Sequence, residues 1–146
     1  MKLQVIIISL FIFSNAFAGR CGLKTSVCSV KYHSTYDGDT FYANVSKFHH
    51  LFKERLGIRL KYINTPELRG SSPAEKIRAK EAKMFTLQKL EKAKRINLYD
   101  CVRGKYFRLV CRVIADGEDI GCSLLKKGMA KRYLDKNNIG YCKLAK

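Results

Sequence analysis

Three carboxylates lie in or beside short turn sequences that follow predicted strands. Asp37 and Asp39 belong to the run Tyr36-Asp37-Gly38-Asp39, and Glu67 ends the run Thr65-Pro66-Glu67. Side chains at strand ends can face a shared cleft, and carboxylate oxygens are the ligands that hard cations prefer. Asp39 could therefore hold a metal ion, and another carboxylate could take a proton from a water molecule.

Two arginines could complete such a site. Arg59 lies in one β-rich run and Arg108 in another. A planar guanidinium stays charged and matches two oxygens of a phosphate, so this set of residue types suits phosphodiester hydrolysis, which needs cations, a base and a water. The alternative interpretation is a plain turn at Asp37-Gly38-Asp39 and ordinary surface positions for both arginines.

Alternating apolar and polar residues predict five β-strands, because successive side chains of a strand point to opposite faces. The predicted strands are residues 27–36, 40–46, 56–63, 96–102 and 106–115. In the third strand, Ile58, Leu60 and Tyr62 share one face, and Arg59 and Lys61 share the other. The first two strands are expected to form a hairpin.

Two helices are predicted after these strands. Ser72-Pro73-Ala74-Glu75 is a capping box with proline at the first helical position, and it predicts a helix through about Lys94. A shorter helix is predicted from Asp119 to Lys127, ended by Gly128. The residues expected to pack the long helix on the sheet are Ala74, Ile77, Met84, Phe85 and Leu87. The predicted fold is α+β: a closed, five-stranded, OB-fold-like β-barrel plus two to three helices.

The first residues have the features of a secretory signal peptide. A charged start at Lys2, an apolar run over residues 3–13 and the sequence Ala16-Phe17-Ala18 predict cleavage near Ala18-Gly19. Removing 18 of 146 residues leaves 128, enough for one domain at residues 19–146. No later segment approaches the ~20 apolar residues of a membrane span. We therefore expect a secreted or periplasmic monomer without stable membrane association.

Cysteine count and net charge narrow the class of protein. All six cysteines follow the predicted cleavage site, which favours up to three disulfides, and Cys101 and Cys111 could pair across a hairpin. The spacings do not suit zinc. A net charge of +17 favours a polyanionic partner, although charge can also serve only to keep an exported protein in solution.

Several short blocks, in this order, resemble the thermonuclease (staphylococcal-nuclease-like) family over residues 30–138. The blocks are Tyr36-Asp37-Gly38-Asp39-Thr40, Ile58-Arg59-Leu60, Thr65-Pro66-Glu67, Lys105-Tyr106-Phe107-Arg108 and Leu124-Leu125-Lys126-Lys127-Gly128-Met129-Ala130. The resemblance implies a calcium-dependent nuclease with DNA and RNA as substrates.

The resemblance also implies roles for particular residues. One calcium ion would be bound by the carboxylate of Asp39 and the backbone carbonyl of Thr65. Glu67 would be the general base that acts on a water, and Arg59 and Arg108 would bracket the scissile phosphate. Each role is carried over by position in the family's motifs.

Three further positions correspond to residues that bind the nucleotide in the family. Lys105 and Tyr106 would hold the terminal phosphate, and Tyr133 would line the base pocket. A tyrosine ring can stack on any base, which suits cleavage with little sequence preference. Ordinary sheet packing is the alternative interpretation for Tyr133.

The sequence departs from the family's pattern at three places. Asn64 stands where the family has a second metal-binding aspartate; its amide oxygen can still coordinate calcium, but affinity should fall with the lost charge. Phe107 stands where glycine is usual. The segment after Asn138 is short, so the family's last helix is expected to be missing or replaced, with Cys142 fastening the tail through a disulfide.

Two rival functions use the same charge and export signals. A catalytically silent OB-fold protein could bind nucleic acid through basic and aromatic side chains, but it would not need Glu67. A secreted, disulfide-rich basic protein could act on membranes or host partners, but this hypothesis explains none of the motif blocks.

Overall fold

A computed structural model describes residues 25–46, 54–69, 72–133 and 141–142. The predicted signal peptide therefore lies outside the described residues. The elements are β1 (Lys31–Thr35), β2 (Thr40–Asn44), β3 (Leu56–Leu60), β4 (Ile63–Asn64), α1 (Pro73–Lys92), β5 (Ile96–Arg103), β6 (Leu109–Ala115), β7 (Glu118–Asp119), α2 (Ile120–Lys126) and β8 (Lys131–Arg132). The predicted α+β class and the predicted order of the main elements are confirmed.

The main sheet has the strand order β1-β2-β3-β6-β5, with β7 paired to β6. Neighbouring strands run antiparallel except β3 and β6, which are parallel with Ile58 opposite Leu109 and Leu60 opposite Cys111. The short strands β4 and β8 form a separate antiparallel pair. The parallel pairing brings Arg108, the residue before β6, next to β3, which carries Arg59.

The expected closed barrel is wrong, because the strands leave the sheet open. The first strand begins at Lys31 rather than at Val27, since Ser29 has a φ of 56° that breaks the extended backbone. On either side of this break, the backbone N–H groups of Val27 and Val30 donate to the carbonyls of Leu98 and Ile96 in β5, over 2.9 and 3.0 Å. The segment before β1 thus contacts β5, the strand at the opposite edge of the sheet, although it is not part of strand β1.

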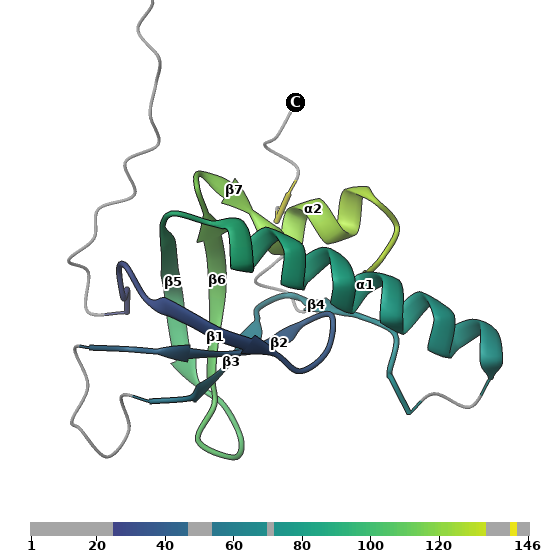
Figure 1. Cartoon of the computed structure of the whole chain (residues 1–146), viewed down its shortest axis with the longest axis horizontal. Helices are drawn as coiled ribbons and strands as arrows, with labels where there is room; N and C mark the ends of the chain where they lie inside the picture. The colour runs from purple at the N-terminus through teal and green to yellow at the C-terminus, as the bar shows by residue number, and fades with distance from the viewer. Residues whose placement is uncertain (1–24, 47–53, 70–71, 134–140, 143–146) are drawn as a thin grey trace, which may run out of the picture.

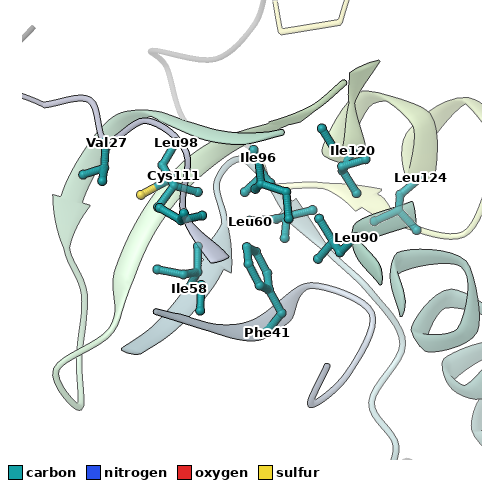
Figure 2. Packing of buried hydrophobic residues seen from close by; sticks show 14 of the residues in the cluster. Val27, Phe41, Ile58, Leu60, Leu90, Ile96, Leu98, Cys111, Ile120 and Leu124 are labelled. Carbon is teal, nitrogen blue, oxygen red and sulfur yellow. The ribbon is translucent and has the colours of Figure 1, made fainter. Parts of the chain in front are cut away.

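One apolar core lies between the sheet and the helices. Phe41 of β2 is fully buried, and Figure 2 shows its ring between Ile58 on one side and Leu60 and Leu90 on the other. The predicted alternation in β3 is confirmed, because Ile58 and Leu60 are buried while Arg59 between them is partly exposed. Tyr62 does not continue this strand; it occupies a turn with a φ of 70°.

The long helix α1 begins as its capping box predicts. Ser72 Oγ accepts a hydrogen bond from the backbone N–H of Glu75 over 3.1 Å, Pro73 is the first helical residue, and the helix ends at Lys92. In Figure 1 the helix crosses in front of the sheet and extends beyond it. No helix among the described residues is both long enough and apolar enough to cross a membrane.

The expected packing face of α1 is largely wrong. Ile77 and Met84 are 59% and 48% exposed. The buried residues of the helix are Ala79, Ala82, Thr86 and Leu90. Small side chains are needed on this face because the helix lies directly against the Asp37–Asp39 turn.

The contact between α1 and this turn is close. Thr86 Oγ1 donates a hydrogen bond to the Gly38 carbonyl over 2.7 Å, and a Cβ atom on Gly38 would lie 2.7 Å from Cβ of Ala82. A larger residue at either position would separate helix and turn. Sequence periodicity alone does not report such a constraint.

Disulfides fasten the β5–β6 hairpin and the end of the chain. The Cys101–Cys111 bridge, one of the pairings that the sequence left open, is present with Cα atoms 4.2 Å apart. Cys142 is bonded to Cys122 in α2, as expected for a fastened tail. Cys28 is also disulfide-bonded. Next to Cys142, the Tyr141 hydroxyl donates to Asp119 Oδ1 over 2.7 Å, and the Tyr141 ring lies 5.0 Å from that of Tyr62.

The β5–β6 connection differs from its prediction. Strand β6 begins at Leu109, not at Tyr106, because Tyr106 and Phe107 both have a φ of 57°. Gly104 N–H donates to the Arg108 carbonyl over 2.8 Å, and this bond closes a tight loop. The loop lies at the bottom of Figure 1, at the opposite end of these strands from β7 and α2.

We predict that Thr86→Val lowers the free energy of unfolding by about 1–3 kcal/mol, because the Gly38 carbonyl loses a buried donor while side-chain volume is kept. Met84→Ala on the exposed face of the same helix should change stability by less than about 0.5 kcal/mol. Urea unfolding of both variants measures the difference. A larger loss for Met84→Ala would contradict the observed orientation of α1.

Candidate active site

The carboxylate of Asp39 is the most connected polar group of the site. Only 4% of this residue is exposed, at the point where the turn enters β2. Its Oδ1 accepts from Thr40 Oγ1 over 3.1 Å and also contacts the Arg59 guanidinium, and its Oδ2 accepts from the Thr65 backbone N–H over 2.9 Å. Three segments of the chain therefore meet at one charged group.

Arg59 joins Asp39 to Asn64. One terminal nitrogen, Nη1, pairs with Asp39 Oδ1; the other, Nη2, contacts Asn64 Oδ1 and lies 3.4 Å from the Ile63 carbonyl oxygen. Asn64 belongs to β4, which β8 holds by antiparallel pairing. The structure thus brings together Asp39, Arg59, Asn64 and Thr65, four of the residues selected from the sequence.

Arg108 lies on the same face of β3 as Arg59. A Cβ atom on Gly57 would lie 2.8 Å from Cγ of Arg108, so the aliphatic part of the Arg108 side chain covers this glycine. Residues 57 and 59 of β3 point to the same face because the side-chain period of a strand is two residues. The Arg108 side chain therefore lies over the face of β3 that carries Arg59, although the two residues are distant in sequence.

The close approach of Arg108 to Gly57 was missed by the sequence interpretation. Its only signal is an isolated glycine inside a strand pattern, which often marks a close approach by another group. The partner, Arg108, could not be identified from the sequence, because it depends on the parallel pairing of β3 with β6.

The side chain of Arg108 is incompletely paired. Its Nε atom is buried and has no hydrogen-bond partner among the described residues. Its guanidinium carbon lies 5.8 Å from the centre of the Tyr106 ring. Leaving a buried donor unpaired is costly, so this geometry favours an anionic partner near the guanidinium.

Glu67 lines a hollow on the surface of the protein. The hollow has a volume of about 480 Å³ and is lined by Ser34, Thr35, Tyr36, Asp37, Tyr42, Glu67, Leu68, Arg69 and Lys83. Glu67 is exposed and comes two residues after Thr65, whose N–H contacts Asp39. Asp39 and the two arginines do not line this hollow, so Glu67 stands at the border of the cluster.

Asp37 shares the hollow with Glu67 and had no assigned role. Its Oδ1 accepts from the backbone N–H of Asp39 over 3.1 Å. The pKa of Asp37 is raised to about 6, first by burial and then by the nearby Asp39 carboxylate, although hydrogen bonds from Asp39 and Thr40 act in the opposite direction. The Asp37–Asp39 turn thus holds a second carboxyl group close to that of Asp39.

The predicted nucleotide-binding residues lie around the cluster. Lys105 and Tyr106 belong to the β5–β6 loop, where Tyr106 is 86% exposed. Tyr133 is 58% exposed and lies next to β8, because its N–H donates to the Tyr62 carbonyl over 2.8 Å. Tyr106 is therefore on the Arg108 side, and Tyr133 is on the Asn64 side.

Comparison with known families adds a match over most of the described chain. The family described as "Staphylococcal nuclease homologue" matches residues 57–144. This chain belongs to that family. The match begins at Gly57 and includes both arginines, Asn64, Thr65 and Glu67, whereas the Asp37–Asp39 turn precedes it. No curated protein matches the chain.

Calcium is the cation that the nuclease family implies, and the donor atoms here suit it in kind. Asp39, Asn64 and Thr65 supply hard oxygen atoms, and the first two lie close enough to contact one guanidinium. The described residues include no group of three or more His, Cys, Asp or Glu side chains with metal-binding geometry. The three oxygen donors Asp39, Asn64 and Thr65 thus carry a single formal negative charge, that of the Asp39 carboxylate.

Arg59 uses part of the same donor set. A carboxylate has about four lone-pair positions, and Arg59, Thr40 and Thr65 already take three on Asp39. Arg59 also contacts the amide oxygen of Asn64. A cation and this guanidinium would compete for the same two oxygens.

We predict that Gly57→Ala lowers kcat/KM on single-stranded DNA by roughly 10- to 100-fold, because the new methyl group displaces Arg108 and small displacements are costly in catalysis. Hydrolysis rates and thermal unfolding together measure the effect. In an Arg108→Ala background the same substitution should have little further effect. An equal fall in that background would show that Gly57 does not act through Arg108.

Proposed function

We propose that this nuclease homologue is an exported phosphodiesterase that hydrolyses DNA and RNA. The observation that carries the proposal is the placement of Arg59 and Arg108 on one face of β3, beside the buried Asp39 carboxylate. Two arginines on one face would suit one phosphate, because each guanidinium can donate two hydrogen bonds to its oxygens. The family membership supports the same class of substrate.

The two arginines would act mainly in the transition state. A phosphate under attack gains negative charge on its oxygens, and donors already in place need no further reorganisation. The Asp39 contact holds Arg59, and the Gly57 backbone supports Arg108. The Arg59 guanidinium thus pairs with a buried carboxylate, and the aliphatic part of Arg108 lies against β3.

Glu67 would be the general base. Its carboxylate faces a hollow large enough for water, and the chain from Thr65 to Glu67 ties it to the Asp39 cluster. A positioned base typically contributes 10²- to 10⁴-fold to the rate of proton transfer. Removing a proton from water prepares the nucleophile that attacks phosphorus.

Asp39, Asn64 and Thr65 would hold one calcium ion. A bound dication supplies positive charge that helps neutralise the phosphate. The asparagine at position 64 leaves Asp39 as the only charged member of the proposed ligand set, which predicts weaker affinity than a second aspartate would give. Arg59 lowers it further by repulsion and by competition for oxygens.

Substrate binding would extend around this centre. Lys105 and Tyr106 would hold a terminal phosphate, and Tyr133 would offer a ring to a base. The net charge of +17 draws any polyanion to the protein and predicts binding that weakens steeply with salt.

Export is part of the proposal. Residues 1–18 have the pattern of a signal peptide, and the two described disulfide bridges suit an oxidising compartment such as a periplasm or the medium. We propose that residues 19–146 form a single nuclease domain that acts as a monomer.

We predict that Glu67→Gln reduces hydrolysis of both DNA and RNA by at least about 100-fold, because the amide cannot accept the proton from water. Oligonucleotide affinity should be nearly unchanged. The hydrolysis rates of purified parent and variant are compared in the presence of calcium, and a reaction with chelator is the control for metal dependence. Equal rates would rule out Glu67 as the base, and no hydrolysis by the parent would favour a protein that only binds nucleic acid.

We predict that Asn64→Asp lowers the calcium concentration for half-maximal rate by roughly tenfold, because it adds a charged oxygen ligand. Calorimetric titration with calcium should show the same direction without reference to activity. Asn44→Asp, a partly buried position in β2, is a control for added charge alone. An unchanged calcium affinity at position 64 would place this side chain outside the metal site.

A further inference from the structure

The β5–β6 loop carries more exposed aromatic surface than its turn requires. Tyr106 is 86% exposed and Phe107 is 67% exposed. Both residues have a φ of 57°, a backbone conformation that is uncommon for bulky side chains and easy for glycine. Turn geometry alone therefore does not account for two large rings at this place.

Each ring has an arginine beside it. The Arg103 guanidinium lies 5.2 Å from the centre of the Phe107 ring, and the Arg108 guanidinium lies 5.8 Å from that of Tyr106. Lys105 is exposed between these pairs in sequence. Rings that can stack on bases, alternating with cations that can bind phosphates, are typical of surfaces that bind single-stranded nucleic acid.

Arg108 connects this loop to the proposed active site. Its aliphatic part lies over Gly57, on the face of β3 that carries Arg59, while its guanidinium lies next to Tyr106. A strand whose phosphate meets the two arginines would thus pass Tyr106 first. The adjacent residue in the loop is Phe107, paired with Arg103.

We propose that Phe107 and Arg103 form an additional nucleotide subsite: the ring stacks on one base beyond the nucleotide at Tyr106, and Arg103 binds the neighbouring phosphate. The proposal rests on the proposed function for the position of the central phosphate. Its ligand is single-stranded DNA or RNA, and it predicts a preference for substrates longer than a dinucleotide.

Charge and continuity favour nucleic acid over a membrane surface. An exposed aromatic loop with basic neighbours can also enter the headgroup region of an anionic bilayer. Here, however, Arg108 reaches from the loop to the face of β3 that carries Arg59, which pairs with Asp39. The loop also points away from α1, at one end of the sheet (Figure 1).

The test is binding of fluorescent oligonucleotides of two to twelve nucleotides to the mature protein, with chelator present to prevent hydrolysis. Phe107→Gly should weaken binding of the twelve-nucleotide strand by roughly 5- to 100-fold and leave dinucleotide affinity unchanged, as expected for one lost stacking contact. Phe107→Tyr should retain affinity. Val102→Ala, an exposed apolar position on the same hairpin, is the matched control and should bind like the parent.

Salt dependence separates the two parts of the subsite. Arg103→Gln should reduce the slope of log affinity against log salt by about 0.7, the value for one phosphate contact on a single strand, whereas Phe107→Gly should leave the slope unchanged. Thermal unfolding of Phe107→Gly shows whether the fold is retained; glycine suits the positive φ, so we expect no loss of stability.

Several outcomes would overturn the subsite. They are unchanged affinity of Phe107→Gly for the long strand, equal losses for the dinucleotide and the long strand, or a loss confined to sedimentation with phosphatidylserine vesicles, which would indicate a membrane surface. Binding is measured without hydrolysis, so the subsite is tested independently of activity. An inactive parent or a fully active Glu67→Gln variant would contradict the proposed function but not the binding result.

Discussion

The buried carboxylate of Asp39 is the interaction on which the rest of the site depends. A charged group with 4% exposure is tolerated only when its oxygens are hydrogen-bonded and its charge is balanced. Thr40, Arg59 and Thr65 meet this requirement from three separate segments. Helix α1 closes the same turn from outside, where Thr86 bonds to the Gly38 carbonyl. The requirement to satisfy one buried charge thus ties together two strands and a loop, and the helix packs on the same turn through a separate hydrogen bond.

Strand β3 and two disulfides hold the residues at the two sides of the site, Arg108 and Asn64. The parallel pairing of β3 with β6 places Arg108 over Gly57, and the Cys101–Cys111 bridge fastens the β5–β6 hairpin, whose loop contains Arg108. On the other side, the Cys122–Cys142 bridge fixes Tyr141 beside Tyr62, and the Tyr141 carbonyl accepts from Arg132 of β8. Since β8 pairs with β4, this tail supports the segment that holds Asn64.

Because Asn64 is uncharged, the only formal charges of the Asp39, Arg59, Asn64 and Thr65 cluster are those of Asp39 and Arg59. One carboxylate, Asp39, faces one guanidinium, Arg59, so the cluster is close to neutral before any substrate or cation binds. A dication and Arg59 would draw on the same oxygens, whereas an incoming phosphate would attract both. Substrate would therefore stabilise a cation that the protein alone holds weakly. In this proposal, the asparagine couples metal binding to the arrival of the polyanion.

Features that depend on neighbouring residues were readable from the sequence itself. These include the capped start of α1 and the alternation of Ile58, Arg59 and Leu60, because their interactions span only a few positions. The sequence offered Cys101–Cys111 only as one possible pairing, which the structure decided. The motif blocks also pointed to the family, which the match over residues 57–144 shows. Only the tertiary structure decided which face of α1 is buried, that the sheet stays open, and that Gly57 supports Arg108. Each of these depends on close packing between segments far apart in the chain, where one methyl group decides what fits and hydrophobic periodicity carries no such detail.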